Sequence, residues 1–151
     1  MSVTVPVGGA VPESKRAAIG ALAQSMLQAP GQFELPIEHL AARGLYGRLC
    51  YMPAGSCVVS RIHLFEHITV ALSGRALVVD PDGVEELVTA PMVRVTPAGM
   101  QRALYILEDA VWLTVHAAEV EDPEAMKEQL TVATMDEFRA AVAALPREHE
   151  A

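Results

Sequence analysis

Two histidines that could bind a metal ion lie four residues apart in RIHLFEHITVALSG, residues 61–74. They are His63 and His67, and Glu66 directly precedes the second. Read as His-x-x-Glu-His, the segment matches a zinc-protease motif in which a helix places both histidines beside the metal ion. The flanking residues are rich in valine, isoleucine and threonine, which favour a strand instead. We therefore reject the protease interpretation.

A strand changes what these residues can do together. Residues of equal parity share one face of a strand, so His63 and His67 point the same way and Glu66 points the other. Both histidines could reach one metal ion if the strand bends or if a short loop separates them, and a bulge could recruit Glu66. The same alternation also describes a half-exposed strand with its histidines in water. This segment alone leaves both interpretations open.

The spacing around the histidines resembles the first motif of the cupin family: Gly, five residues, His-x-His, three or four residues, Glu, six residues, Gly. The corresponding positions in this chain hold Gly55, Arg61, His63, His67 and Gly74. Further on, PAGMQR at residues 97–102 resembles the second cupin motif, Pro-x-Gly-x-x-His. The resemblance covers roughly residues 45–117. The whole chain is similar to small cupin-like proteins encoded by bacteriophages and prophages.

This resemblance implies a cupin-type double-stranded β-helix, or jelly-roll, barrel with a metal site inside it. The family's site takes two histidines and a glutamate from the first motif and one histidine from the second. Here Arg61 stands at the first histidine position, His67 at the glutamate position and Arg102 at the motif-two histidine position. Only His63 is unchanged, and imidazole at His67 is a conservative replacement because it binds the same borderline metals.

His116 is a candidate third ligand, at the end of AVWLTVHA, residues 110–117. If this segment forms a hairpin with RALYIL through the LED turn, His116 lies opposite Arg102, or opposite Gln101 with a shorter loop. A strand-end histidine at the barrel rim explains the residue equally well. A site of His63, His67 and His116 would suit Zn, Fe, Ni or Cu and leave positions for water or substrate.

Arg61 and Arg102 would lie close to this site. If no metal binds, two arginines in a barrel mouth make a pocket for a small anion or carboxylate. Each is also explained as a rim arginine whose charge reaches water. The sequence thus supports two alternatives. The first is a metal-binding protein, which would be an enzyme if the ion activates water, oxygen or a small carbonyl compound. The second is a non-catalytic module that binds a small anion or has a structural or interaction role. Fold alone does not separate the two.

The rest of the chain predicts a mainly β domain that positions these residues. Short β-rich runs alternate with turn signals such as PDG at residues 81–83, as in sandwiches and barrels. Asp122-Pro123 is typical of a helix start, and Thr134 to Glu137 fits a capping box. The predicted parts are a flexible arm at 1–12, a helix (about 13–28) and linker at 13–43, the barrel at 44–118 and a helical segment at 119–151.

Composition limits the partners. The 151 residues carry a net charge of −8 at pH 7, and no basic run occurs, which argues against nucleic acid or an anionic membrane. No apolar run approaches the roughly 20 residues of a membrane span, and no signal peptide is recognisable. We expect a cytoplasmic protein with a small-molecule ligand. The cupin resemblance implies a homodimer, formed through the aliphatic face around Ile62, Leu64 and Ile68.

Overall fold

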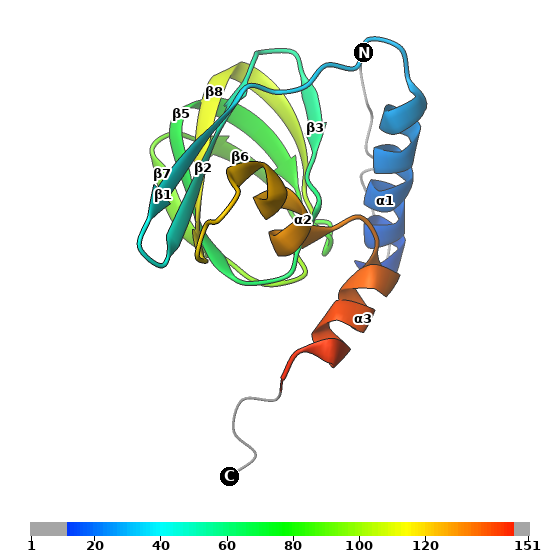
Figure 1. Ribbon diagram of the computed structural model, residues 1–151. Coiled ribbons are helices and arrows are strands. Elements are labelled where there is room, and N and C mark those ends of the chain that lie inside the picture. The colour runs from blue at the N-terminus through cyan, green and yellow to red at the C-terminus, as the bar shows by residue number, and fades with distance from the viewer. Residues whose placement is uncertain (1–11, 147–151) are drawn as a thin grey trace.

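Two long antiparallel strands form the frame of the barrel. β5 (His67–Val79) and β8 (Ala103–Ala117) pair with each other along most of their length in the computed structural model, which describes residues 12–146 (Figure 1). The first part of β5 also pairs with β7 (Met92–Thr96) and its second part with β6 (Glu85–Thr89). Since β5 changes its outer partner midway, it contributes to both ends of the barrel.

β8 changes partners in the same way. Its first residues pair with β3 (Cys57–Val59) and its last eight with β2 (Leu45–Met52). β1 (Ile37–Ala42) extends the sheet beyond β2, in a region predicted as linker. The strand order is therefore β1-β2-β8-β5-β6, with β3 on β8 and β7 on β5. All of these pairs are antiparallel, and Figure 1 shows the sheet curled into a barrel, which confirms the predicted jelly-roll class.

The bend in β5 depends on Gly74. Its φ of 87° lies in the left-handed region, and a Cβ there would come within 2.6 Å of the Cα of Ala110 on β8. The pairing of β5 with β8 shifts register on both sides of this glycine. Only glycine allows the backbones to approach this closely, and the shift lets the long strands turn the corner of the barrel.

The hairpin predicted at the LED turn is wrong, because β8 runs without interruption through residues 107–109. β5 offers this part of β8 a continuous antiparallel partner, and Glu108 stays in the ladder opposite Arg75. Asp109 serves a different turn, since its carboxylate accepts a hydrogen bond of 2.8 Å from the backbone N–H of Ala54. Long-range pairing has overridden a local turn signal.

Helices flank the barrel on one side (Figure 1). α1 (Pro12–Gln28) matches the predicted helix and lies alongside β3, with Ile19 only 1% exposed. The predicted arm lies outside the described residues, apart from Pro12. None of the helices that the structure describes is long and apolar enough to cross a membrane.

The C-terminal segment follows the predicted helix signals. It contains the short 3-10 helix η1 (Pro123–Ala125), α2 (Met126–Leu130), β9 (Thr131–Val132) and α3 (Met135–Ala144). The Asp122 side chain caps η1, and the capping box of Thr134 and Glu137 is present at α3. β9 pairs with β4 (Ile62–His63) in a separate two-stranded sheet. This pairing fastens the C-terminal segment to the strand that carries His63.

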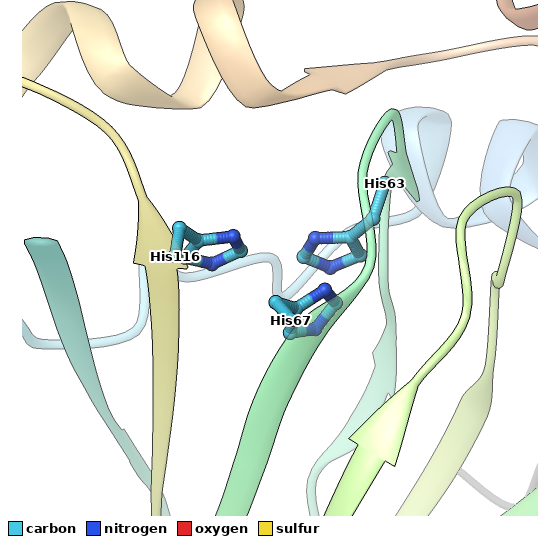
Figure 2. A group of neighbouring side chains, drawn as sticks. All are labelled: His63, His67 and His116. Carbon is cyan, nitrogen blue, oxygen red and sulfur yellow. The ribbon is translucent and has the colours of Figure 1, made fainter.

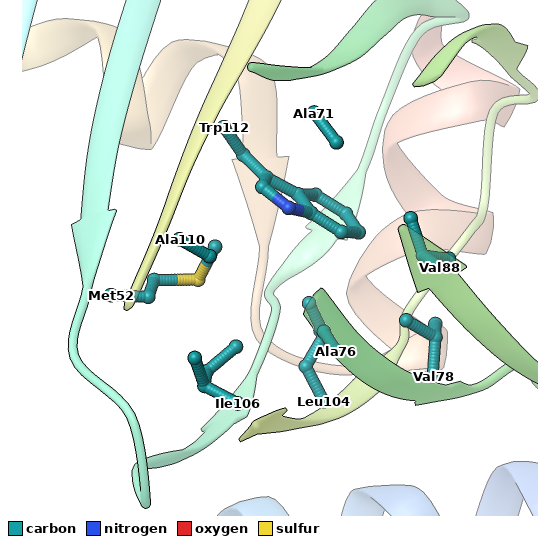
Figure 3. Close-up of a cluster of buried hydrophobic side chains, with 9 residues drawn as sticks. All are labelled: Met52, Ala71, Ala76, Val78, Val88, Leu104, Ile106, Ala110 and Trp112. Carbon is teal, nitrogen blue, oxygen red and sulfur yellow. The ribbon is translucent and has the colours of Figure 1, made fainter. Parts of the chain in front are cut away.

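The core lies inside the barrel, where β2, β5, β6 and β8 contribute side chains, and Figure 3 shows its nine buried side chains. They are Met52, Ala71, Ala76, Val78, Val88, Leu104, Ile106, Ala110 and Trp112. Along β8 the inward side chains change from Ala110 and Trp112 to Thr114 and His116, so one strand leads from apolar core to polar cavity. Ile62 is 1% exposed and does not belong to the predicted outer face, whereas Ile68 is 38% exposed and does.

Candidate metal centre

Three histidines converge from three strands (Figure 2). His63 ends β4, His67 begins β5 and His116 lies near the end of β8. One potential ligand nitrogen from each ring lies within 4.8 Å of the other two. The ring centroids are 4.2 Å apart for His63 and His67, 4.5 Å for His67 and His116, and 5.7 Å for His63 and His116.

The backbone explains why these residues meet. A short loop at residues 64–66 separates His63 from His67, so the chain turns instead of continuing as the single strand first considered. Ile68 pairs with Val115 in the β5–β8 ladder, which brings His67 beside His116. His116 therefore joins the cluster through β5, and the hairpin partner predicted from the LED turn plays no part.

Burial keeps the three imidazoles neutral. Burial is the largest cause that lowers the pKa of His63 to about 3, and repulsion from His67, His116, Arg48 and Arg102 makes up the rest of the shift. Burial likewise lowers the pKa of His116 to about 4. The pKa of His67 is also lowered by burial, although a hydrogen bond to a backbone carbonyl opposes the shift. Neutral imidazole is the form that binds a metal ion.

Hydrogen bonds orient two of the rings. His67 Nδ1 lies 3.2 Å from the carbonyl oxygen of Phe65, which can only accept, so Nδ1 carries the proton and Nε2 keeps a free lone pair. His116 Nε2 lies 3.1 Å from the hydroxyl of Thr114. His63 Nδ1 differs, because it is buried and has no hydrogen-bond partner among the residues that the structure describes. Such an atom costs free energy unless something binds it.

The three other predicted site residues lie in different surroundings. Arg61 donates from Nε to the Thr131 hydroxyl at 2.8 Å and forms an ion pair of 3.5 Å with Glu128, so it ties the barrel rim to the C-terminal segment. Arg102 lines the cavity and donates to the hydroxyl of Thr96 at 3.3 Å. Glu66 is exposed and does not line the cavity, so we leave it out of the site.

Sequence reasoning missed two residues of β2. Tyr46 and Arg48 both line the cavity. Tyr46 is 2% exposed, stacks on His116 with ring centroids 6.0 Å apart, and has its hydroxyl 2.6 Å from Nδ1 of His39. Arg48 lies opposite Thr114, one inward position along from His116. The alternation of YGRLCYM could have placed both side chains on the inner face.

The histidines open into a cavity of about 640 Å³. Residues of β2, β3 and β8 form its walls, and α1, α2 and the segment after α1 contribute side chains at its edge. Figure 2 shows α2 and β9 lying over the histidine cluster. The volume is within the range of small-molecule sites, about 300–1,000 Å³.

Solved structures resemble this chain only at low sequence identity. No protein-family model matches the chain, and no curated protein matches it. Among solved structures, a cupin-family protein with a double-stranded β-helix fold from Methanocaldococcus jannaschii is 9% identical over 66% of this chain and 91% of its own, with a TM-score of 0.49. A double-stranded β-helix protein from Klebsiella pneumoniae is 17% identical over 59% and 81%, also with a TM-score of 0.49.

A predicted oxalate decarboxylase from Thermotoga maritima is 20% identical over 57% of this chain and 82% of its own, with a TM-score of 0.46. At these identities and TM-scores the similarities do not show any activity or ligand for this chain. The fold class is defined by the strand pairing itself. The chain is a mainly β, double-stranded β-helix protein with a three-histidine cluster in its barrel. The narrower resemblance to phage-encoded proteins stays a prediction.

Proposed function

We propose that this protein binds one divalent transition-metal ion through His63, His67 and His116. The observation that carries the proposal is the buried Nδ1 of His63, which has no hydrogen-bond partner among the described residues. A metal ion would compensate its burial, and one potential ligand nitrogen from each of the three rings lies within 4.8 Å of the other two. Zn, Fe, Ni and Cu all suit three imidazole ligands.

The three rings are held in the neutral form that a metal ion needs. Burial is the largest cause of the lowered pKa of His63, and the repulsion from Arg48 and Arg102 that also lowers it would act on a bound cation as well. The bond from His67 to the Phe65 carbonyl fixes that ring before a metal arrives. Outer hydrogen bonds of this kind orient ligands and raise their basicity.

The proposed site leaves room for a small molecule. Three protein ligands leave at least one position on the ion for water or substrate, where the metal would act as a Lewis acid. The cavity beside the cluster has the volume for such a ligand. Met126 and Leu130 of α2 are buried with Tyr46, which limits water access on that side.

Titration of metal-depleted protein with Co²⁺ tests the proposal. We expect one equivalent to bind and to give visible absorption bands that depend on the imidazole ligands. His63→Ala, His67→Ala and His116→Ala should each weaken binding more than the about 10–100-fold that loss of an outer partner costs. His39→Ala is the matched control, since His39 contacts Tyr46 and Glu124 outside the cluster. Equal loss in the control, or no stoichiometric binding, would contradict the proposal.

A further inference from the structure

Charge is distributed unevenly between the cavity and the rest of the chain. The protein carries 19 acidic and 11 basic residues, yet no Asp or Glu of the described residues lines the cavity. Four cationic side chains line it together with the three histidines: Arg48, Arg61, Arg102 and Lys127. An acidic protein thus encloses a cavity whose formal charges are all positive. Such a concave site concentrates anions.

Two of these four cationic side chains have a partner or contact with solvent that stabilises their charge. Arg61 forms its ion pair with Glu128, and Lys127 is exposed at the edge. In contrast, no carboxylate of the described residues lies within ion-pair distance, 4.0 Å, of Arg48 or Arg102. Two partly buried guanidinium groups without an anionic partner cost free energy that a bound anion would recover.

The contacts of Arg102 show how little negative charge lies beside its guanidinium. Its guanidinium donates a hydrogen bond to the hydroxyl of Thr96, which also shares a hydrogen bond of 2.7 Å with Thr69. Burial lowers the pKa of the Arg102 guanidinium, and the neighbouring Arg94 lowers it further, although two acidic residues oppose this. The Arg94 charge is itself paired with Glu86 at 2.6 Å. Arg102 thus has no directly paired carboxylate among the described residues, although Asp80 and Glu86 offset part of its charge from a greater distance.

Arg48 and Arg102 approach the cavity from two different segments of the barrel wall. Arg48 lies within β2, opposite Thr114, and Arg102 directly precedes β8. Both lie near enough to the histidine cluster for their charges to affect His63. The remaining wall is largely apolar, with side chains that include Phe33, Leu35, Val58, Leu104 and Trp112. A ligand that fits must combine one compact negative group with an apolar body.

We propose that the cavity binds a small organic carboxylate whose charge is held by Arg48 and Arg102 and whose apolar body packs against the wall around Trp112. A guanidinium fork matches the two oxygens of a carboxylate. A carboxylate carries a single charge, which suits a mainly apolar cavity better than a more strongly hydrated phosphate. The proposal goes beyond metal binding, because neither arginine is a metal ligand.

Trp112 provides the readout, since it is the only tryptophan in the chain and lines the cavity. Metal-depleted protein in EDTA is titrated with 3-phenylpropionate and, separately, with its uncharged analogue 3-phenylpropanamide. We expect a saturable change in fluorescence with the acid and affinity for the amide at least about 10-fold weaker. Equal affinity for acid and amide, or no saturable change, would overturn the proposal. So would tighter binding of phenyl phosphate.

Variants identify the groups that hold the charge. Arg48→Gln and Arg102→Gln should each weaken acid binding about 10-fold or more and leave amide binding unchanged. Arg75→Gln is the control, because Arg75 pairs with Glu108 and does not line the cavity. Arg48→Lys and Arg102→Lys, which keep the charge, should retain more affinity than the Gln variants. Unchanged acid binding in folded Gln variants, checked by circular dichroism, would refute the assignment.

Repeating the titration with Zn²⁺ separates this inference from the proposed metal site. Arginine-dependent acid binding in EDTA supports the inference even if the protein takes up no metal. Acid binding that appears only with Zn²⁺ and ignores both arginines would refute it, while leaving the metal proposal intact.

Discussion

Replacing His63 by leucine should affect the metal-free and metal-loaded proteins in opposite directions. Without metal, the buried Nδ1 of His63 has no hydrogen-bond partner among the described residues. An unpaired buried polar atom costs about 1–3 kcal/mol, and leucine removes it at similar side-chain volume. We therefore expect His63→Leu to raise the free energy of unfolding by about 1–3 kcal/mol in EDTA.

With metal present, the wild type should gain stability that the His63→Leu variant does not. Free metal at 100 times its Kd stabilises a one-site protein by about 2.7 kcal/mol, and the variant should lose most of this gain. Urea denaturation followed by circular dichroism, in EDTA and in Zn²⁺, measures both effects. The result depends on neither the substrate nor the reaction.

His116→Leu is the matched control. His116 Nε2 already contacts the hydroxyl of Thr114 at 3.1 Å, and its ring stacks on Tyr46. The same substitution there removes a satisfied group and should lower stability in EDTA. If His63→Leu destabilises the metal-free protein by more than about 1 kcal/mol, or keeps the full response to Zn²⁺, the account of the His63 site is wrong.

Three further predictions concern the barrel, its acid response and its assembly. Gly74→Ala should destabilise the protein by more than the roughly 1 kcal/mol typical of glycine positions, because its Cβ would meet the backbone of β8; an unchanged urea midpoint would contradict this. His63 and His116 have folded pKa values of about 3 and 4, below the unfolded value of 6.5. The free energy of unfolding of the metal-free protein should therefore be highest above pH 6.5 and fall by about 1.4 kcal/mol per pH unit and site below it, down to each folded pKa. Urea midpoints that stay constant from pH 7 to pH 5 would argue against buried neutral rings. We also expect a homodimer through the outer face of β7 and β5, where Val93 and Val95 are 69% and 60% exposed. Light scattering should show a dimer for the wild type and a monomer for the Val93→Lys/Val95→Lys variant. A monomeric wild type would disprove this expectation.

Local signals in the sequence were sufficient for much of the fold. The capping box at Thr134 and the helix start at Asp122-Pro123 depend on neighbouring residues alone, and both are present. The PDG hairpin between β5 and β6 depends on Gly83, whose φ is 78°. Such signals predict the ends of elements because the backbone requirement and the residue that meets it lie together.

Long-range pairing could not be predicted in the same way. The LED segment has the composition of a turn, but β5 pairs with it and keeps β8 continuous. His116 does join the histidine cluster, but the register of β5 with β8 brings it beside His67, whereas the sequence prediction relied on a hairpin at the LED turn. Arg48 stands in no motif and is significant only because no carboxylate of the described residues lines the cavity around it. The pairing of Arg61 with Glu128 likewise joins residues 67 positions apart.

The most direct test of the metal site is the metal content of the purified protein, measured beside that of a His63→Ala/His67→Ala double variant. We predict close to one equivalent of a transition metal per chain in the wild type, directly or after reloading, and its loss in the folded variant. If neither protein holds metal even after incubation with Zn²⁺, or if the double variant holds as much as the wild type, the three histidines are not a metal site.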